Sequence, residues 1–299
     1  MLTAALIREG VDRALAEDAP WGDLTATHVL PESATAVARL VPREPGVLSG
    51  GAVFAEAFAR VNPHAGSADG PAIEVRLALE DGMAFSRGDV LATVAGPARA
   101  VLTAERVALN FVQRMSGIAT LTARYVEAVA GTRARIVDTR KTTPGLRAFE
   151  RHAVVSGGGR NHRFGLSDAV MLKDNHLAVL AAEGAALPDA LRALRDRLGH
   201  MVRIEVEVDR LDQLPDVLAG GADVIMLDNF SLEDLRRGVE LIGGRAIVEA
   251  SGGVSLETVG AIAATGVDVI SVGALTHSAA ALDLGLDIEL DRAGHPGRP

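Results

Sequence analysis

The second half of the chain alternates short apolar runs with amphipathic stretches, and this alternation constrains the fold more than any other feature. The apolar runs have strand length and cover residues 135–138, 169–172, 203–208, 223–227, 246–249 and 268–272. Helical periodicity lies between them, over 188–198, 211–219, 232–241 and 256–264, with Ser231 and Ser255 as expected N-caps. Alternating strands and helices with short connections predict parallel strands, in either an α/β barrel or a doubly wound sheet.

Polar and glycine residues gather where these runs end. Lys173, Glu207, Asp228, Ser251 and Gly273 each close or follow a predicted strand on its carboxyl side. In an α/β barrel, the carboxyl ends of the strands form the rim that carries the active site. The positions therefore favour a barrel with a functional site at that rim.

The first half of the chain has a different pattern. Short β-prone runs at 36–41, 73–79 and 90–94 are separated by Gly, Pro and Asp turns, which predicts a hairpin-rich module. Helices are expected over 2–17, 52–61 and 103–125. The last of these has one apolar face, and Arg106 lies on its opposite, polar face.

Composition excludes several classes of function. The net charge of −9 disfavours nonspecific binding to nucleic acid or to an anionic membrane. The absence of cysteine excludes disulfides, thiolate metal sites and cysteine nucleophiles. The first twenty residues do not resemble a signal peptide, and no apolar run approaches the roughly 18 residues of a membrane span. We expect a soluble cytoplasmic protein.

Lysine is almost missing from this chain, and its two positions are informative. Arginine outnumbers lysine 28 to 2, and both lysines, Lys141 and Lys173, fall within residues 138–176. That segment holds seven Lys or Arg and four Asp or Glu, a local net charge of +3. An ammonium is a compact point charge that a guanidinium does not imitate at a tight anion contact. We expect a small anionic ligand here; the alternative is that two residual surface lysines remain by chance.

Two glycine-bearing turns follow the last two predicted strands. Ser251, Gly252 and Gly253 lie in the first turn, and Gly273 lies in the second. Glycine allows the backbone to approach a phosphate closely, and α/β barrels often build a phosphate site from these two loops. The turns therefore predict phosphate binding, whereas the competing interpretation is two tight turns without a ligand.

Two carboxylates, Glu207 and Asp228, end neighbouring predicted strands. Beside a phosphate, such oxygen ligands favour Mg²⁺. Glu205 points to the same side of its strand as Glu207, and the pattern leaves open which of the two reaches the metal. Surface salt bridges are the alternative role.

A cationic group completes the candidate site, with members Arg140, Lys141, His162, Arg163 and Lys173. Guanidinium groups bind carboxylates with two parallel hydrogen bonds, so the set suits a polycarboxylate beside a polyphosphate. His162 could act as a general base, but its position beside Arg163 favours a hydrogen-bond donor to a carboxylate.

Several long motifs occur in a fixed order. The basic segment contains DTRKTTPGLR, GGGRNHRFGLSD and MLKDNH; EVEVD, MLDNF, SGGVS and VGALTHS follow, and ALAEDAPWGDLT and AERVALNFVQRMSGIAT precede. Over nearly the whole chain these motifs resemble the quinolinate phosphoribosyltransferase family, the carboxylating nicotinate-nucleotide pyrophosphorylases. The resemblance implies an α/β protein with two domains: an N-terminal α/β sandwich module with an interface helix over 1–116, and an incomplete, open α/β barrel with a C-terminal tail over 117–299.

The resemblance also implies a reaction. Quinolinate and phosphoribosyl pyrophosphate would give nicotinate mononucleotide, pyrophosphate and CO₂ with Mg²⁺, in a homodimer or higher oligomer whose sites are shared between subunits. The implied catalytic residues are Lys141, Lys173, Glu207 and Asp228. The quinolinate site would comprise Arg106 of the neighbouring subunit with Thr139, Arg140, His162, Arg163 and Lys173. The phosphoribosyl pyrophosphate site would comprise Lys141, Glu207, Asp228, Ser251, Gly252, Gly253 and Gly273, with Glu207 and Asp228 serving the metal directly or indirectly.

Three competing functions remain open at this point. A strand-end lysine in a barrel could form a Schiff base, as in an aldolase-type lyase, although Lys173 lies among other charged residues. The chain could also be a ligand sensor on an inherited fold, because fold does not prove function. A paralogous phosphoribosyltransferase for another anionic ring is the nearest alternative.

Overall fold

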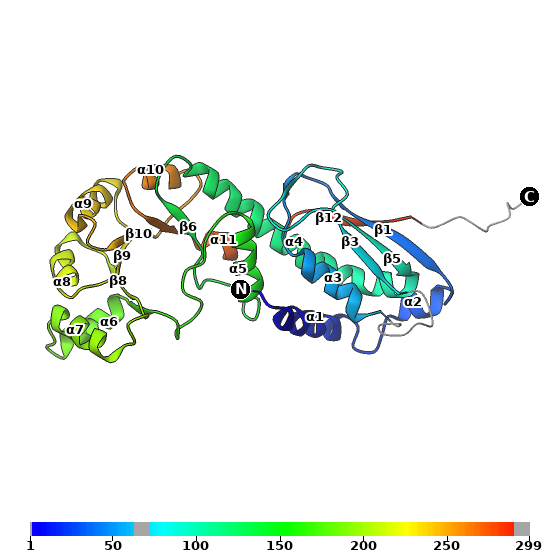
Figure 1. The fold of residues 1–299 in the computed structure, drawn as a ribbon, viewed down its shortest axis with the longest axis horizontal. Helices are drawn as coiled ribbons and strands as arrows, with labels where there is room; N and C mark the ends of the chain where they lie inside the picture. The colour runs from blue at the N-terminus through cyan, green and yellow to red at the C-terminus, as the bar shows by residue number, and fades with distance from the viewer. Residues whose placement is uncertain (1, 63–71, 290–299) are drawn as a thin grey trace, which may run out of the picture. The chain divides into compact units, whose positions relative to one another are not determined.

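The computed structural model describes residues 2–62 and 72–289, and the chain forms two compact units (Figure 1). The first unit takes the chain up to Leu121, then Pro144–Gly157, and the chain from Ala279 onward. The second unit takes Thr122–Thr143 and Gly158–Ser278. The predicted division at residues 116 and 117 falls inside helix α4 (Ala98–Ala128), which contributes to both units. Residues 290–299 of the expected C-terminal tail lie outside the described residues.

The first unit is built on a four-stranded antiparallel sheet in the order β12-β1-β5-β3. Its strands are β1 (Thr35–Pro42), β3 (Glu74–Leu77), β5 (Ala92–Pro97) and β12 (Leu284–Glu289). Every second residue of β1 is buried, as expected for a sheet with one face in a core. Helices α1 (Ala4–Asp18) and α3 (Gly51–Arg60) belong to this unit, with the short elements α2 (Leu24–Val29), β2 (Gly46–Val47) and β4 (Ala84–Phe85).

Strand β12 is one of the elements of this unit that the sequence pattern did not predict. It pairs with β1 although more than 240 residues separate Leu40 from its partner Leu286. The segment before it crosses α4 closely, because a Cβ built on Gly117 would lie 1.9 Å from the carbonyl oxygen of Ala280. Gln113 then holds this segment by accepting from the Leu282 amide and donating to the Leu284 carbonyl oxygen. Glycine is required where the two backbones meet.

The second unit contains six parallel strands in the order β6-β11-β10-β9-β8-β7. Each observed strand overlaps a predicted one: β6 (Arg135–Val137), β7 (Val170–Leu172), β8 (Ile204–Val208), β9 (Val224–Asp228), β10 (Ile247–Ser251) and β11 (Val269–Ser271). Strands β6 and β7 are the two ends of this sheet, and no described strand joins them. The predicted open α/β barrel is confirmed.

Helices cover the outer side of this sheet, as Figure 1 shows for α8, α9 and α10. The helices of the unit are α6 (Asp174–Ala182), α7 (Leu187–Arg197), α8 (Leu214–Ala219), α9 (Leu232–Ile242), α10 (Val259–Ala263) and α11 (Ala274–His277), with a 3₁₀ turn at Leu211–Gln213. Ser231 caps α9 as predicted, by accepting from the Asp234 amide. The expected cap at Ser255 is wrong: residues 256–258 form a turn, and α10 begins only at Val259.

Helix α5 (Arg147–Ser156) interrupts the basic segment, and the sequence pattern did not single it out. It belongs to the first unit and buries Phe149, Ala153 and Val154. Its charged residues lie within the basic segment 138–176, which the sequence analysis interpreted as an anion site rather than as a helix. Across the described parts of the chain, no helix has both the length and the apolar character needed to cross a membrane.

Candidate active site

A cavity of about 700 Å³ lies at the carboxyl ends of the strands of the second unit. This volume suits a small-molecule ligand. Twelve of the thirteen predicted site residues line it: Thr139, Arg140, Lys141, His162, Arg163, Lys173, Glu207, Asp228, Ser251, Gly252, Gly253 and Gly273. The exception is Arg106, an exposed residue of α4 in the first unit that is not among the described lining residues.

Strand register explains why residues distant in sequence meet here. Glu207 of β8 pairs across Met226 of β9 with Glu249 of β10. One layer further along, Asp228 of β9 is level with Ser251 of β10. Parallel strands in register bring their carboxyl ends to one edge, so all these side chains open onto the same cavity.

The cationic group comes from the two ends of the open sheet. Arg140 and Lys141 follow β6, whereas Lys173 follows β7. The loop between α5 and β7 pairs with β6 through a single parallel bridge from Val137 to Arg160. Arg163 follows this bridge and lines the cavity. Burial lowers the pKa of Arg163, and the charge of Arg140 lowers it further. The two guanidinium groups repel each other, so an anion bound between them would be stabilised.

Lys173 forms an ion pair with Glu207, with 2.5 Å between Nζ and Oε2. The Glu207 side chain is 14% exposed and that of Lys173 is 45% exposed. The sequence predicted these residues for different ligands, a polycarboxylate and a metal-bound polyphosphate. Their contact places the expected carboxylate and phosphate regions directly beside each other.

Both glycine turns pack closely against neighbouring residues. Gly252 has φ of +89°, and a Cβ built there would lie 2.1 Å from Oδ1 of Asn229. Asn229 itself has φ of +58° and donates its amide to the Ser251 carbonyl oxygen. A Cβ on Gly273 would lie 3.0 Å from Cδ of Lys141. The turns are therefore held by side chains, and they leave backbone surface open to the cavity.

Neither glycine turn leads directly into a long helix, so little helix dipole acts on either turn. Residues 256–258 separate the first turn from α10, and α11 after Gly273 has only four residues. The polar groups at these turns are backbone amides and Lys141, whose carbonyl oxygen accepts from Oγ1 of Thr276.

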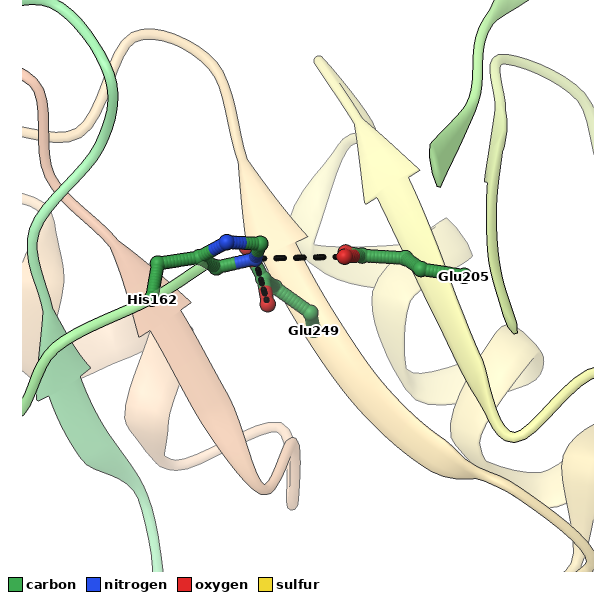
Figure 2. A group of neighbouring side chains, drawn as sticks. All are labelled: His162, Glu205 and Glu249. Carbon is green, nitrogen blue, oxygen red and sulfur yellow. Dashed lines mark ion pairs between the residues drawn. The ribbon is translucent and has the colours of Figure 1, made fainter. Parts of the chain in front are cut away.

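His162 lies between two carboxylates inside the barrel, as Figure 2 shows. Its Nε2 is 3.2 Å from Glu205 Oε2 and 3.3 Å from Glu249 Oε2. Burial lowers the pKa of His162, but hydrogen bonds and the charges of the two glutamates outweigh burial and raise it to about 10. Burial, together with the charge of Glu249, raises the pKa of Glu205 against the hydrogen bond from His162. The three groups titrate together, so the proton retained at neutral pH belongs to the cluster; because Nδ1 of His162 accepts from the Arg163 amide, this proton lies on the side of Nε2 and the two carboxylates.

The structure separates the two glutamates of β8 that the sequence left equivalent. Glu205 and Glu207 lie on the same face of β8, yet Glu205 binds His162 deeper in the barrel and Glu207 reaches the cavity. Glu207 and Asp228 also line a smaller adjoining cavity of about 330 Å³ with Asp174 and Asp209. Their carboxylate oxygens fit the preference of Mg²⁺ for oxygen ligands.

Several residues of the cavity were missed by sequence reasoning. They are Asp138, Met171, Met226, Asn229, Glu249, Val254, Ser271, Ala274 and His277. Asp138 and Asn229 follow predicted strands, so the strand-end rule could have found them. Glu249 lies two residues before Ser251 on the same strand, so the alternation of side chains in a strand could have found it.

The fold and the site together define an α/β protein with a cationic cavity and two glycine turns at the rim of an open barrel. A family model described as the C-terminal domain of quinolinate phosphoribosyl transferase matches residues 118–287. A second model, described as the N-terminal domain of the same enzyme, matches residues 23–116. The chain belongs to the quinolinate phosphoribosyltransferase family, which confirms the resemblance of its motifs.

Individual proteins give the same result. The chain is 45% identical over 285 residues to the nicotinate-nucleotide pyrophosphorylase [carboxylating] of Mycobacterium leprae (strain TN), covering 94% of this chain and 96% of that protein. It is 43% identical over 274 residues to a probable nicotinate-nucleotide pyrophosphorylase [carboxylating] of Bacillus subtilis (strain 168), covering 92% and 90%. The crystal structure of NadC from Streptococcus pyogenes superposes with a TM-score of 0.89 at 39% identity, covering 97% of this chain and 99% of that one.

Proposed function

We infer that this protein transfers the phosphoribosyl group of phosphoribosyl pyrophosphate to the ring nitrogen of quinolinate, with loss of CO₂, and so makes nicotinate mononucleotide for NAD biosynthesis. The observation that carries this inference is a single cavity that is lined by the complete cationic set and by both glycine turns. Family membership supports the same reaction.

The chemistry matches what the cavity offers. The pyridine nitrogen carries no proton, so its lone pair forms the new bond to the ribose carbon as the bond to pyrophosphate breaks. The protein must align two anions and stabilise charge on the leaving group, which are tasks for fixed cations. Once the nitrogen is quaternary, it accepts the electron pair released when the adjacent carboxylate leaves as CO₂.

We assign the carboxylates of quinolinate to the cationic side of the cavity. Arg140 and Arg163 supply forks for the carboxylates, with Thr139 and His162 in the same subsite and Lys173 adding a point charge. The Lys173–Glu207 pair would separate when the ligands bind, so that each charge meets its own partner.

We assign the phosphate groups to Lys141 and to the two turns. Ser251, Gly252, Gly253 and Gly273 line the same cavity, and Lys141 lies against Gly273. Mg²⁺ is proposed as the cofactor, held by Glu207 and Asp228 directly or through water; when bound, it would neutralise charge on the departing pyrophosphate.

We further propose a homodimer, or a higher oligomer, in which Arg106 completes the quinolinate site of a neighbouring subunit. Arg106 is exposed on α4, while its neighbours Val107 and Ala108 are buried, so the side chain is available to a partner. An acidic enzyme of this kind would act in the cytoplasm, and cell fractionation with an activity assay would test that location.

The function is tested by incubating the protein with quinolinate, phosphoribosyl pyrophosphate and Mg²⁺. Formation of nicotinate mononucleotide, with equal amounts of CO₂ and pyrophosphate, is expected. Nicotinate in place of quinolinate is the matched control, and a preference for nicotinate or another anionic ring would establish the paralogous function instead. Lys173 is ion-paired and 45% exposed, unlike a desolvated Schiff-base lysine, so borohydride with a carbonyl substrate should trap no adduct.

A further inference from the structure

Two buried glutamates that contact His162 have no role in the reaction described above. Glu205 is 6% exposed and Glu249 is 2% exposed. Each directs one oxygen to His162, while the other oxygen, Oε1, is buried without a hydrogen-bond partner in the described part of the chain. Burying two carboxylates this way is costly, so their arrangement needs a physical reason.

The second nitrogen of His162 shows what the carboxylates hold in place. Nδ1 accepts a hydrogen bond of 2.8 Å from the backbone amide of Arg163. Since Nδ1 is an acceptor, the network assigns the ring hydrogen to Nε2, where it is shared between Glu205 and Glu249. Both nitrogens of His162 are thus engaged within the protein, and its side chain is only 15% exposed.

This geometry disfavours a metal ion among the three groups. Nε2 and one oxygen of each carboxylate lie within 4.8 Å of one another, a spacing that a small cation could span. A cation would take the Nε2 lone pair, and the ring hydrogen would then move to Nδ1. There it would face the amide hydrogen of Arg163, so the observed contact fits a hydrogen-bonded ring rather than a ligated one.

The line of contacts continues to the cavity. Asp138 accepts from the His162 backbone amide at 2.8 Å, which fixes the backbone just before Arg163. The guanidinium of Arg163 donates to the Ala169 carbonyl oxygen at 3.2 Å and lines the cavity. Small shifts of the His162 ring would therefore move the arginine that faces the ligand.

We propose that Glu205 and Glu249 are positioning residues of the quinolinate subsite. They fix the orientation of the His162 ring, and the ring in turn orients Arg163. His162 also lines the cavity, so its orientation bears on the quinolinate subsite directly as well as through Arg163. The proposal rests on the proposed function, because it gives a reason for how Arg163 meets a substrate carboxylate.

The first test is the effect of Glu249→Leu and Glu205→Leu on each Michaelis constant. We expect KM for quinolinate to rise about 5- to 100-fold, because the Nε2 hydrogen loses an acceptor, while KM for phosphoribosyl pyrophosphate changes less than about twofold. Glu249→Gln and Glu205→Gln keep an acceptor oxygen and should recover most of the loss. Glu240→Gln on the exposed side of α9 is the matched control. Leucine variants that lower thermal stability but leave KM for quinolinate unchanged would overturn the proposal.

The second test is a double-mutant cycle with His162→Asn. The shorter amide can still accept from the Arg163 backbone but does not reach the carboxylates. If the glutamates act through His162, adding Glu249→Leu to His162→Asn produces no further rise in KM for quinolinate. Independent, multiplicative effects would show that Glu249 acts by another route and would contradict the proposal.

The third test measures the tautomer of the His162 ring directly, and it does not depend on the reaction. In the intact wild-type protein, ¹⁵N NMR should show an unprotonated Nδ1 and a protonated Nε2 for His162, identified by the signals lost in His162→Asn. A reversed tautomer would contradict the proposed positioning role. Stoichiometric Zn²⁺ binding that Glu249→Leu abolishes would show that the three groups form a metal site instead. Failure of the wild-type protein to use quinolinate would reject the proposed function. The tautomer of His162 is a separate result that tests only the positioning role of Glu205 and Glu249.

Discussion

At the scale of single residues, the two lysines of this chain are the most informative. Both line the cavity, and each contacts another predicted site residue: Lys173 binds Glu207, and Lys141 packs against Gly273. The surrounding surface uses arginine almost exclusively. A compact ammonium fits beside a glycine and a carboxylate where a planar fork does not.

Lys141→Ala and Lys173→Ala are each expected to remove most of the activity without unfolding the protein. Each variant loses a charged contact worth about 1.5–3 kcal/mol, which corresponds to a fall of about 10- to 150-fold in kcat/KM. Circular dichroism checks the fold, and Arg236→Ala, at an exposed position of α9, is the control. Wild-type kinetics in either lysine variant would remove the basis for an anion site at these lysines.

The metal is tested at the same scale. A chelator should abolish activity, and excess Mg²⁺ should restore it, because charge on the leaving pyrophosphate needs neutralisation. Asp228→Asn should raise the Mg²⁺ concentration needed for half-maximal activity. Full activity in EDTA would mean that Glu207 and Asp228 have other roles, such as the ion pair with Lys173.

At the scale of elements, Asp81 connects the start of one helix with another helix of the first unit. Its two oxygens accept from the Gly50 and Gly51 amides at the N-terminus of α3, at 3.0 and 2.9 Å. One of them also pairs with Nε2 of His152 on α5 at 2.7 Å. Burial raises the pKa of Asp81, but these hydrogen bonds outweigh burial and leave the pKa below its usual value. The ionised carboxylate therefore stabilises the fold.

Asp81→Asn is expected to lower the free energy of unfolding by about 1.5–3 kcal/mol at pH 7. The folded-state pKa of Asp81 is depressed, so its contribution is full above the unfolded pKa of about 4 and is lost as pH falls through the folded value. Urea unfolding at a series of pH values should show the difference between wild type and variant shrinking below about pH 4. A constant difference down to pH 2 would contradict this assignment.

At the scale of the whole molecule, each cavity is predicted to need a residue from another subunit. Among the described residues, the cavity of one chain is lined by residues of its second unit alone. Arg106 is exposed on α4 and is the predicted donor in trans. In a two-fold assembly, each subunit gives and receives the same group.

The test mixes inactive Arg106→Ala with inactive Lys173→Ala under conditions that allow subunits to exchange. A hybrid dimer then has one site with both defects and one site with neither, so about half of the wild-type activity per hybrid should return. Exchange is verified with differently tagged chains. Demonstrated exchange with activity at background would show that Arg106 does not act in trans.

The sequence alone was sufficient for the six strands of the barrel and for the residues at their ends. Short apolar runs and strand-end polar residues are local signals, and parallel strands must bring their carboxyl ends to one edge. Twelve of the thirteen predicted site residues therefore line one cavity. Helix α5 was not predicted, because its charged residues resemble those of the site residues that flank it in sequence.

Only the tertiary structure decided which charge meets which partner. Glu205 and Glu207 are equivalent by alternation, yet one holds His162 and the other holds Lys173. Likewise, β12 joins β1 across almost the entire chain, and no local pattern records that pairing. Local propensity and periodicity are properties of neighbouring residues, whereas ion pairs and strand order depend on the register between segments far apart in sequence, which packing alone fixes.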